Sequence, residues 1–264
     1  MKDQHMKKIC LALALAGGIV VPQISHAQYA DAVISYTSGT GFAAGFTNAS
    51  AALGAPASGS SITPFAPSSS KSQLVSIGAG GEITLQFNTP IVNDPNDPYG
   101  IGFVLFANQF FVSSGGEVSS LFDHAASVVV QVSADDSTWY TLDSSLAPQP
   151  GTLYPTYGGG NPLVPVNPAL TLADFEGQTL AGVESLYGGS AGGTGYDLAW
   201  ATNSSGASAD LASADYVRIE VNTGVLDLDA VSVMAAPDAM STSWALAAIG
   251  AGLFGLYPRI KDRA

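Results

Sequence analysis

Cysteine is almost absent from this chain, since Cys10 is the single one in 264 residues. It lies inside an apolar run near the N-terminus, so the long remainder of the chain has none. That remainder can form neither a disulfide, nor a thiolate nucleophile, nor a cysteine-ligated metal site. Its stability must therefore come from a packed core or from bound ions.

Histidine and basic residues are also scarce. Residues 28–236 contain one histidine, His124, and two basic residues, Lys71 and Arg218, against 18 acidic residues. Such a negatively charged chain repels nucleic acid, so we expect no nucleic-acid partner. The composition is compatible with divalent cations, basic partners or neutral glycans as ligands, and equally with an acidic surface that only keeps the protein soluble.

The same scarcity limits catalysis. One histidine without cysteine supplies too few ligands for a histidine-based zinc site, and His124 beside Asp123 defines no catalytic triad in a serine-rich chain. Paired carboxylates could hydrolyse glycosides, but nothing in the sequence selects a pair. We therefore expect a protein that is not an enzyme, and a secreted glycan-active enzyme is the alternative.

The N-terminal segment 1–27 has the pattern of a secretory signal peptide. Three lysines precede an apolar run over residues 9–21, and the small residues Ser25 and Ala27 then occupy positions −3 and −1 of a cleavage site. This order predicts export with cleavage after Ala27. The alternative is an N-terminal membrane anchor, for which the apolar run is short.

Residues 28–236 are long enough for one domain, and their apolar residues recur in short blocks between turns rich in glycine and proline. Ile83, Leu85 and Phe87 alternate with polar residues, which is the period of a half-buried strand. Similar blocks predict strands within 31–36, 72–87, 101–111, 127–133, 138–142, 216–221 and 226–233. The second block should contain a hairpin around Gly78–Gly81, and the third should form one strand or two. This pattern predicts an all-β protein, a β-sandwich.

Two segments of this domain have other patterns. Within 170–188, Leu180, Val183 and Leu186 fall at helical spacing, and Asp174 could cap a short helix. Residues 148–168 are rich in proline and glycine and predict a long irregular loop.

The C-terminal segment 237–264 contains an apolar run of about 18 residues that ends in a basic tip with Arg259, Lys261 and Arg263. Crossing a bilayer takes ~20 apolar residues, so this run is a short membrane segment. Basic residues favour the cytoplasmic side of a membrane. The sequence therefore predicts a single-pass hydrophobic helix that holds the preceding domain outside the membrane.

The order of signal peptide, exported domain, proline-containing signature, apolar helix and basic tip resembles that of PEP-CTERM proteins, which are exported bacterial surface proteins. The signature here is "APDAMST", with Pro237 and Asp238. It is most similar to the Val-Pro-Asp-Ser-Gly variant, although the valine is missing and Met240 stands where small residues are usual. The resemblance implies that an exosortase-type sorting protease recognises and cleaves the tail. A permanent membrane anchor is the alternative.

The exported domain is also similar to surface proteins of that family, in the stretches 36–56, 75–111, 130–142 and 185–201. The blocks "VQVSADDSTWYTL" and "YVRIEV" further resemble the discoidin-type, galactose-binding-like jelly roll. This second resemblance implies a jelly-roll-like β-sandwich. It is only a weak indication of glycan binding, because such folds carry many functions.

Calcium is the metal that this composition favours, because it binds carboxylate, amide and carbonyl oxygens in bent loops. The stretch "NDPNDPYG" places two aspartates among prolines. In "GTGYDLAW" one aspartate follows flexible glycines, and in "LDLDAV" two aspartates lie on the same face of a strand. The predicted calcium ligands are therefore Asp94, Asp97, Asp197, Asp227 and Asp229. An Asx-Pro turn explains the first pair equally well, and a solvated strand face explains the last.

Tyr154 and Tyr157 lie in the long loop, and tyrosine rings on loops are suited to bind sugars. We predict that they bind glycan, with core packing as the alternative. Together these patterns predict an exported, non-catalytic protein of the cell surface or extracellular matrix with a structural or adhesive role. The membrane, a sorting protease and extracellular polysaccharide are its expected partners. The alternative is a calcium-assisted carbohydrate-binding module.

Overall fold

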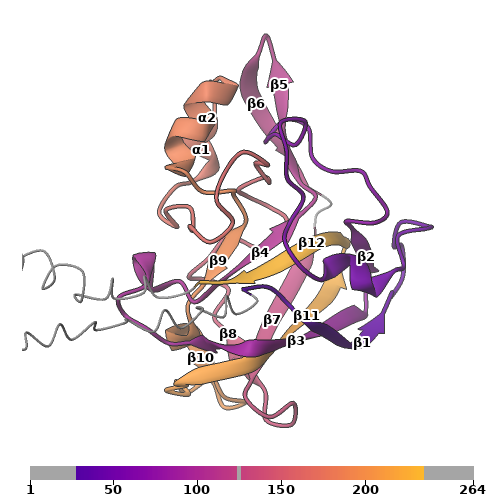
Figure 1. Cartoon of the computed structure of the whole chain (residues 1–264), viewed down its shortest axis with the longest axis vertical. Coiled ribbons are helices and arrows are strands. Elements are labelled where there is room, and N and C mark those ends of the chain that lie inside the picture. The colour runs from indigo at the N-terminus through magenta and orange to yellow at the C-terminus, as the bar shows by residue number, and fades with distance from the viewer. Residues whose placement is uncertain (1–27, 124–125, 235–264) are drawn as a thin grey trace, which may run out of the picture.

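Short strands recur throughout the part of the chain that the computed structural model describes, residues 28–123 and 126–234. One sheet has six strands in the order β1–β3–β11–β7–β8–β10, and a second has four in the order β2–β12–β4–β9 (Figure 1). Two further strands, β5 and β6, pair as a separate ribbon. Neighbouring strands run antiparallel in all three.

The six-stranded sheet consists of β1 (Ala32–Thr37), β3 (Gly81–Val92), β11 (Ser213–Thr223), β7 (Ser127–Ser133), β8 (Tyr140–Leu142) and β10 (Ala201–Thr202). The four-stranded sheet consists of β2 (Val75–Gly78), β12 (Val225–Val233), β4 (Phe103–Ala107) and β9 (Thr194–Tyr196). The ribbon consists of β5 (Phe110–Ser114) and β6 (Glu117–Phe122). The helices are α1 (Leu172–Phe175), α2 (Leu180–Tyr187) and the 3-10 turns η1 (Ala49–Ala52), η2 (Pro98–Gly100) and η3 (Leu198–Trp200).

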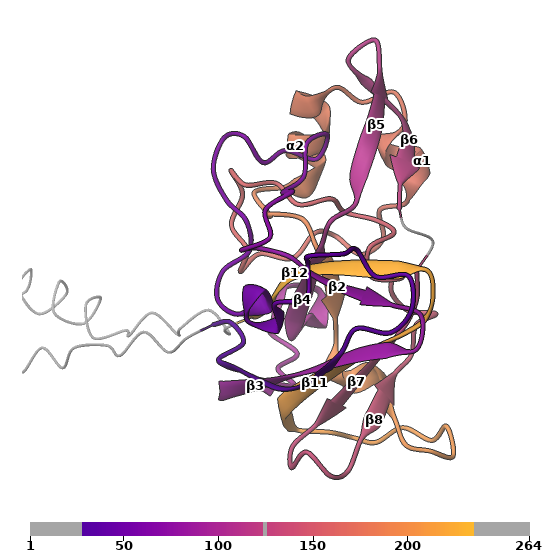
Figure 2. The same ribbon diagram turned by 90° about the vertical axis from the view of Figure 1, so that its right-hand side faces the viewer.

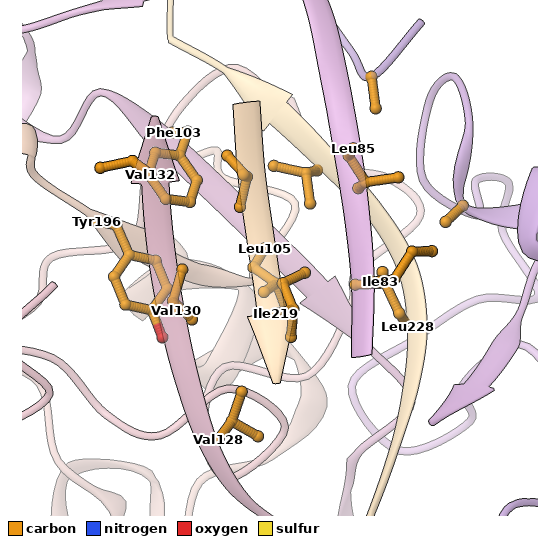
Figure 3. Close-up of a cluster of buried hydrophobic side chains, with 14 of the residues drawn as sticks. Ile83, Leu85, Phe103, Leu105, Val128, Val130, Val132, Tyr196, Ile219 and Leu228 are labelled. Carbon is orange, nitrogen blue, oxygen red and sulfur yellow. The ribbon is translucent and has the colours of Figure 1, made fainter. Parts of the chain in front are cut away.

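The two larger sheets share one hydrophobic core (Figure 3). Ile83 of β3, Val130 of β7 and Ile219 of β11 contribute from the first sheet, and Leu105 of β4 and Leu228 of β12 contribute from the second. Each of these side chains is at most 3% exposed. The predicted all-β class is therefore confirmed, and two antiparallel sheets around one core are consistent with a β-sandwich.

The predicted hairpin at Gly78–Gly81 is wrong. β2 pairs with β12, whereas β3 pairs with β1 and β11, so this turn carries the chain from one sheet to the other. A Cβ atom on Gly78 would overlap the carbonyl oxygen of Thr40, and one on Gly81 would overlap that of Thr37. Both glycines are therefore needed because a neighbouring backbone segment packs directly on the turn.

The apolar run 101–111 forms two strands, which is one of the two outcomes that the sequence allowed. β4 joins the four-stranded sheet, and β5 leaves it to form the ribbon with β6. The ribbon and the two α-helices lie together at the same end of the molecule in both views (Figures 1 and 2). Phe111 of β5, Phe175 of α1 and Val183 of α2 pack there in a second hydrophobic cluster.

The helical pattern over 170–188 is confirmed as two helices and not one. Gly177 separates them with a φ of +74°, a conformation that ends a helix readily. Asp174 acts within the first turn of α1, where its Oδ2 accepts a hydrogen bond from the amide of Thr171 at 2.7 Å.

The first and last described residues lie side by side. Tyr29 and Ser232 form an antiparallel bridge. The amide of Val233 donates a hydrogen bond to the carbonyl oxygen of Gln28 at 2.8 Å. The two ends of the domain are therefore fixed to each other at the end of β12.

Several sequence predictions concern residues that the structure does not describe. These are the signal peptide with Ala27, the tail with Pro237 and Asp238, and His124. Among the described residues, no helix is both long and apolar enough to cross a membrane.

Candidate cation-binding site

The acidic loop between β3 and β4 is shaped by its own side chains. Oδ1 of Asp94 accepts hydrogen bonds from the backbone amide and the side-chain amide of Asn96, at 2.8 and 2.7 Å. The amide of Asp97 donates to the carbonyl oxygen of Asp94 at 3.0 Å, and Tyr99 and Gly100 then take positive φ angles of 59° and 73°. The Asx turn considered from the sequence is therefore present.

This loop meets the segment that follows β9. Asp197 caps η3, and its Oδ1 accepts a hydrogen bond from the amide of Ala199 at 2.8 Å. A Cβ atom on Gly100 would lie 2.8 Å from Oδ2 of Asp197. The close approach places Asp197 beside the loop that carries Asp94 and Asp97, although about 100 residues separate them in sequence.

Asp97 is the buried member of this group. Its side chain is 4% exposed, and Oδ1 has no hydrogen-bond partner among the described residues. Burial is the main cause that raises the pKa of Asp97 to about 6, and the negative charges of Asp94 and Asp197 raise it further. Burial also raises the pKa of Asp197. The structure thus concentrates negative charge around a carboxylate that has lost its water.

The basic residues of the described chain, Lys71 and Arg218, are engaged elsewhere. The ammonium of Lys71 lies 5.7 Å from the ring centre of Phe46. Arg218 bonds to Gln131 and forms an ion pair with Glu220 at 3.2 Å. Neither of them neutralises Asp97.

A cavity of about 180 Å³ opens beside this carboxylate. Pro90, Val92 and Met234 are among the side chains that make its wall mostly apolar. Asp94 and Asp97 supply its acidic side, and Gln28 also lines it. We call this the Asp97 cavity. Such a cavity can bind a cation. Its apolar wall does not solvate the two carboxylates, so a cation placed beside them would stabilise their negative charge.

The described residues contain no group of three or more histidine, cysteine, aspartate or glutamate side chains arranged to hold a metal ion. Asp94, Asp97 and Asp197 therefore lie near one another without forming a ready ligand set. A calcium ion here would need backbone carbonyl groups or water for much of its coordination.

Asp227 and Asp229 do not line the Asp97 cavity. Leu226 and Leu228 point into the shared core, so Asp227 between them lies on the other face of β12. Both aspartates are buried rather than solvated. Both carboxylate oxygens of Asp229 accept from the amide of Ala57, at 3.1 and 2.9 Å. Burial raises the pKa of Asp229 to about 7, against the opposing effect of that hydrogen bond. Asp229 thus ties the loop after η1 to the sheet.

The two tyrosines predicted to bind glycan lie in different surroundings. Tyr154 is 1% exposed, and its hydroxyl donates to the carbonyl oxygen of Leu170 at 2.6 Å. Its ring therefore belongs to the second hydrophobic cluster and presents no face to a sugar. Tyr157 is half-buried and lines a small cavity of about 50 Å³. Burial first, and then the charge of Glu184, raises the pKa of Tyr157.

No protein-family model matches this chain, and no curated protein matches it significantly.

The residue that sequence reasoning missed is Gln28. No local pattern marks it, because it reaches the Asp97 cavity only through its backbone pairing with Val233 at the other end of the described domain.

Proposed function

We propose that this is an exported, non-catalytic protein of the bacterial cell surface or extracellular matrix, with a structural or adhesive role. The observation that carries the proposal is the position of the two ends, since the bond from Val233 to Gln28 fixes them to each other. A leader and a sorting tail therefore attach at one edge of the domain. The remaining surface, acidic and rich in loops, is left to contact extracellular polysaccharide.

Within this proposal the exported domain is a jelly-roll-like sandwich. The six-stranded and four-stranded sheets around one core support this fold. The tail is held in the membrane and cleaved by an exosortase-type protease, on the strength of its tripartite pattern. The proposal takes the domain to be non-catalytic, because residues 28–236 contain one histidine and no cysteine, and their sequence selects no pair of carboxylates for catalysis.

The test is to express the whole chain in an exosortase-containing bacterium and follow its fate. The mature protein should begin at Gln28, should leave the inner membrane, and should be shortened at its C-terminus. Replacing Pro237 and Asp238 with alanine should keep the chain in the membrane at full length. Recovery of the wild-type chain in the cytoplasm with its leader intact would refute the proposal.

A second candidate function, a calcium-assisted carbohydrate-binding module, is favoured by the Asp97 cavity. Two acidic residues, Asp94 and Asp97, line this cavity of about 180 Å³. Co-sedimentation of the mature protein with extracellular polysaccharide should then be lost in chelator and restored by calcium. Binding that survives the chelator would remove calcium from the function and leave the glycan contact.

A further inference from the structure

The Asp97 cavity lies where the expected mature chain begins. Gln28 lines this cavity together with Asp94 and Asp97. Its carbonyl group is held by the amide of Val233 at 2.8 Å, and Tyr29 next to it bridges to Ser232. The first residue after the predicted cleavage site is therefore held at the cavity wall by strand-like backbone pairing.

The cavity needs a positive charge that the described side chains do not provide. Oδ1 of Asp97 is buried and has no hydrogen-bond partner among the described residues, and Asp94 lines the same cavity. Lys71 and Arg218 bind other groups. A buried carboxylate without a partner is strongly unfavourable, whereas one with a hydrogen-bonded cation is tolerated.

Signal-peptide cleavage would create such a cation at Gln28. In the precursor the nitrogen of Gln28 is an uncharged amide. Hydrolysis adds one water across the Ala27–Gln28 bond, which leaves a carboxylate on Ala27 and an ammonium group on Gln28. We propose that this new α-ammonium group occupies the Asp97 cavity and pairs with Asp97 and Asp94. The inference rests on the proposed export and on cleavage after Ala27.

An ammonium group fits the observed geometry better than a metal ion does. It brings three N–H donors and needs only one or two acceptors. Calcium needs six to eight oxygen ligands, and the described residues hold no ready-made group of three acidic or histidine ligands. The consequence is that cleavage itself stabilises the domain, since the precursor carries no charge at this nitrogen.

The test is a double-mutant cycle on the full chain, expressed with its leader in an exporting bacterium and purified after processing. One change inserts a single alanine after Ala27, which moves the ammonium group away from Gln28 by about 3.5 Å. The other is Asp97→Asn. Intact mass establishes the N-terminus of each protein, and urea unfolding gives its unfolding equilibrium constant. Asp136→Asn, at an exposed turn position, is the matched control background.

The insertion should raise the unfolding constant about 10- to 100-fold in the wild-type and Asp136→Asn backgrounds. In the Asp97→Asn background it should change that constant less than about threefold, because the partner is already gone. Equal effects in all backgrounds, or none in any, would overturn the pairing.

The mass readout separates this inference from the proposed function. A retained leader would overturn both, because no ammonium group would form at Gln28. Correct cleavage followed by loss of ammonia, as Gln28 cyclises to an uncharged pyroglutamate, would overturn the pairing alone. Stabilisation by calcium chloride that requires Asp97, together with an inert insertion, would assign the cavity to a divalent cation instead.

Discussion

Replacing Asp229 with asparagine should stabilise the domain at pH 8. Asp229 is 3% exposed, and its pKa is raised by burial from 3.8 to about 7. A difference of about three pKa units corresponds to ~4 kcal/mol of unfavourable ionisation in the folded state. Asparagine keeps an acceptor for the amide of Ala57 but loses one of the two contacts, at a cost of ~1 kcal/mol. The expected net gain in the free energy of unfolding is therefore about 2–4 kcal/mol.

The pH dependence of the wild-type protein follows from the same shift. Between about pH 4 and 7 the folded form holds a proton on Asp229 that the unfolded form has released. This contribution to stability is complete below the unfolded pKa and is lost as pH rises through the folded one. Asp97 and Asp197 have raised pKa values as well, so the variant should keep part of the slope.

The assay is urea unfolding at pH 5 and pH 8, with Asp136→Asn as the exposed control. Asp229→Asn should gain stability at pH 8 and change little at pH 5. The control should change little at either pH. A loss of stability at pH 8 would refute the reasoning, since it would mean that the ionised carboxylate binds a partner worth more than its desolvation.

Three further predictions concern packing. Gly100→Ala should lower the free energy of unfolding in urea by about 2–4 kcal/mol, because the new Cβ would lie 2.8 Å from Oδ2 of Asp197 at a φ of +73°. The control Gly115→Ala, at a φ of +65° in open space, should lower it by only about 1 kcal/mol. Equal losses for the two variants would disprove the clash. Tyr154→Phe should cost about 1 kcal/mol by removing the hydroxyl bond to Leu170, with polysaccharide co-sedimentation unchanged; reduced co-sedimentation would show that this tyrosine does contact glycan. Leu85→Ala in the shared core should cost about 2–5 kcal/mol, whereas Ile34→Ala, at a side chain that is 44% exposed, should cost less than about 1 kcal/mol. Similar thermal shifts for these two variants would contradict the assigned core.

The strands were predictable because their signal is local. Ile83, Leu85 and Phe87 alternate with polar residues, and this period alone directs one face inward whatever the partner strand is. The Asx turn at Asp94 was predictable for the same reason, since its hydrogen bonds reach only two residues along the chain. The scarcity of cysteine and histidine likewise excludes disulfides, thiolate nucleophiles and histidine-based zinc sites in residues 28–236, because folding cannot supply a residue type that the sequence lacks.

The tertiary structure alone decided which strands pair and which polar groups lose their water. The turn at Gly78–Gly81 reads locally as a hairpin, but pairing with β11 and β12 sends its two strands into different sheets. Gln28 and Asp197 are both far from Asp97 in sequence, and only packing brings Gln28 to the Asp97 cavity and Asp197 beside the loop that carries Asp97. The physical reason is that strand formation depends on neighbours along the chain, whereas burial and charge pairing depend on tertiary contacts between residues far apart in the sequence.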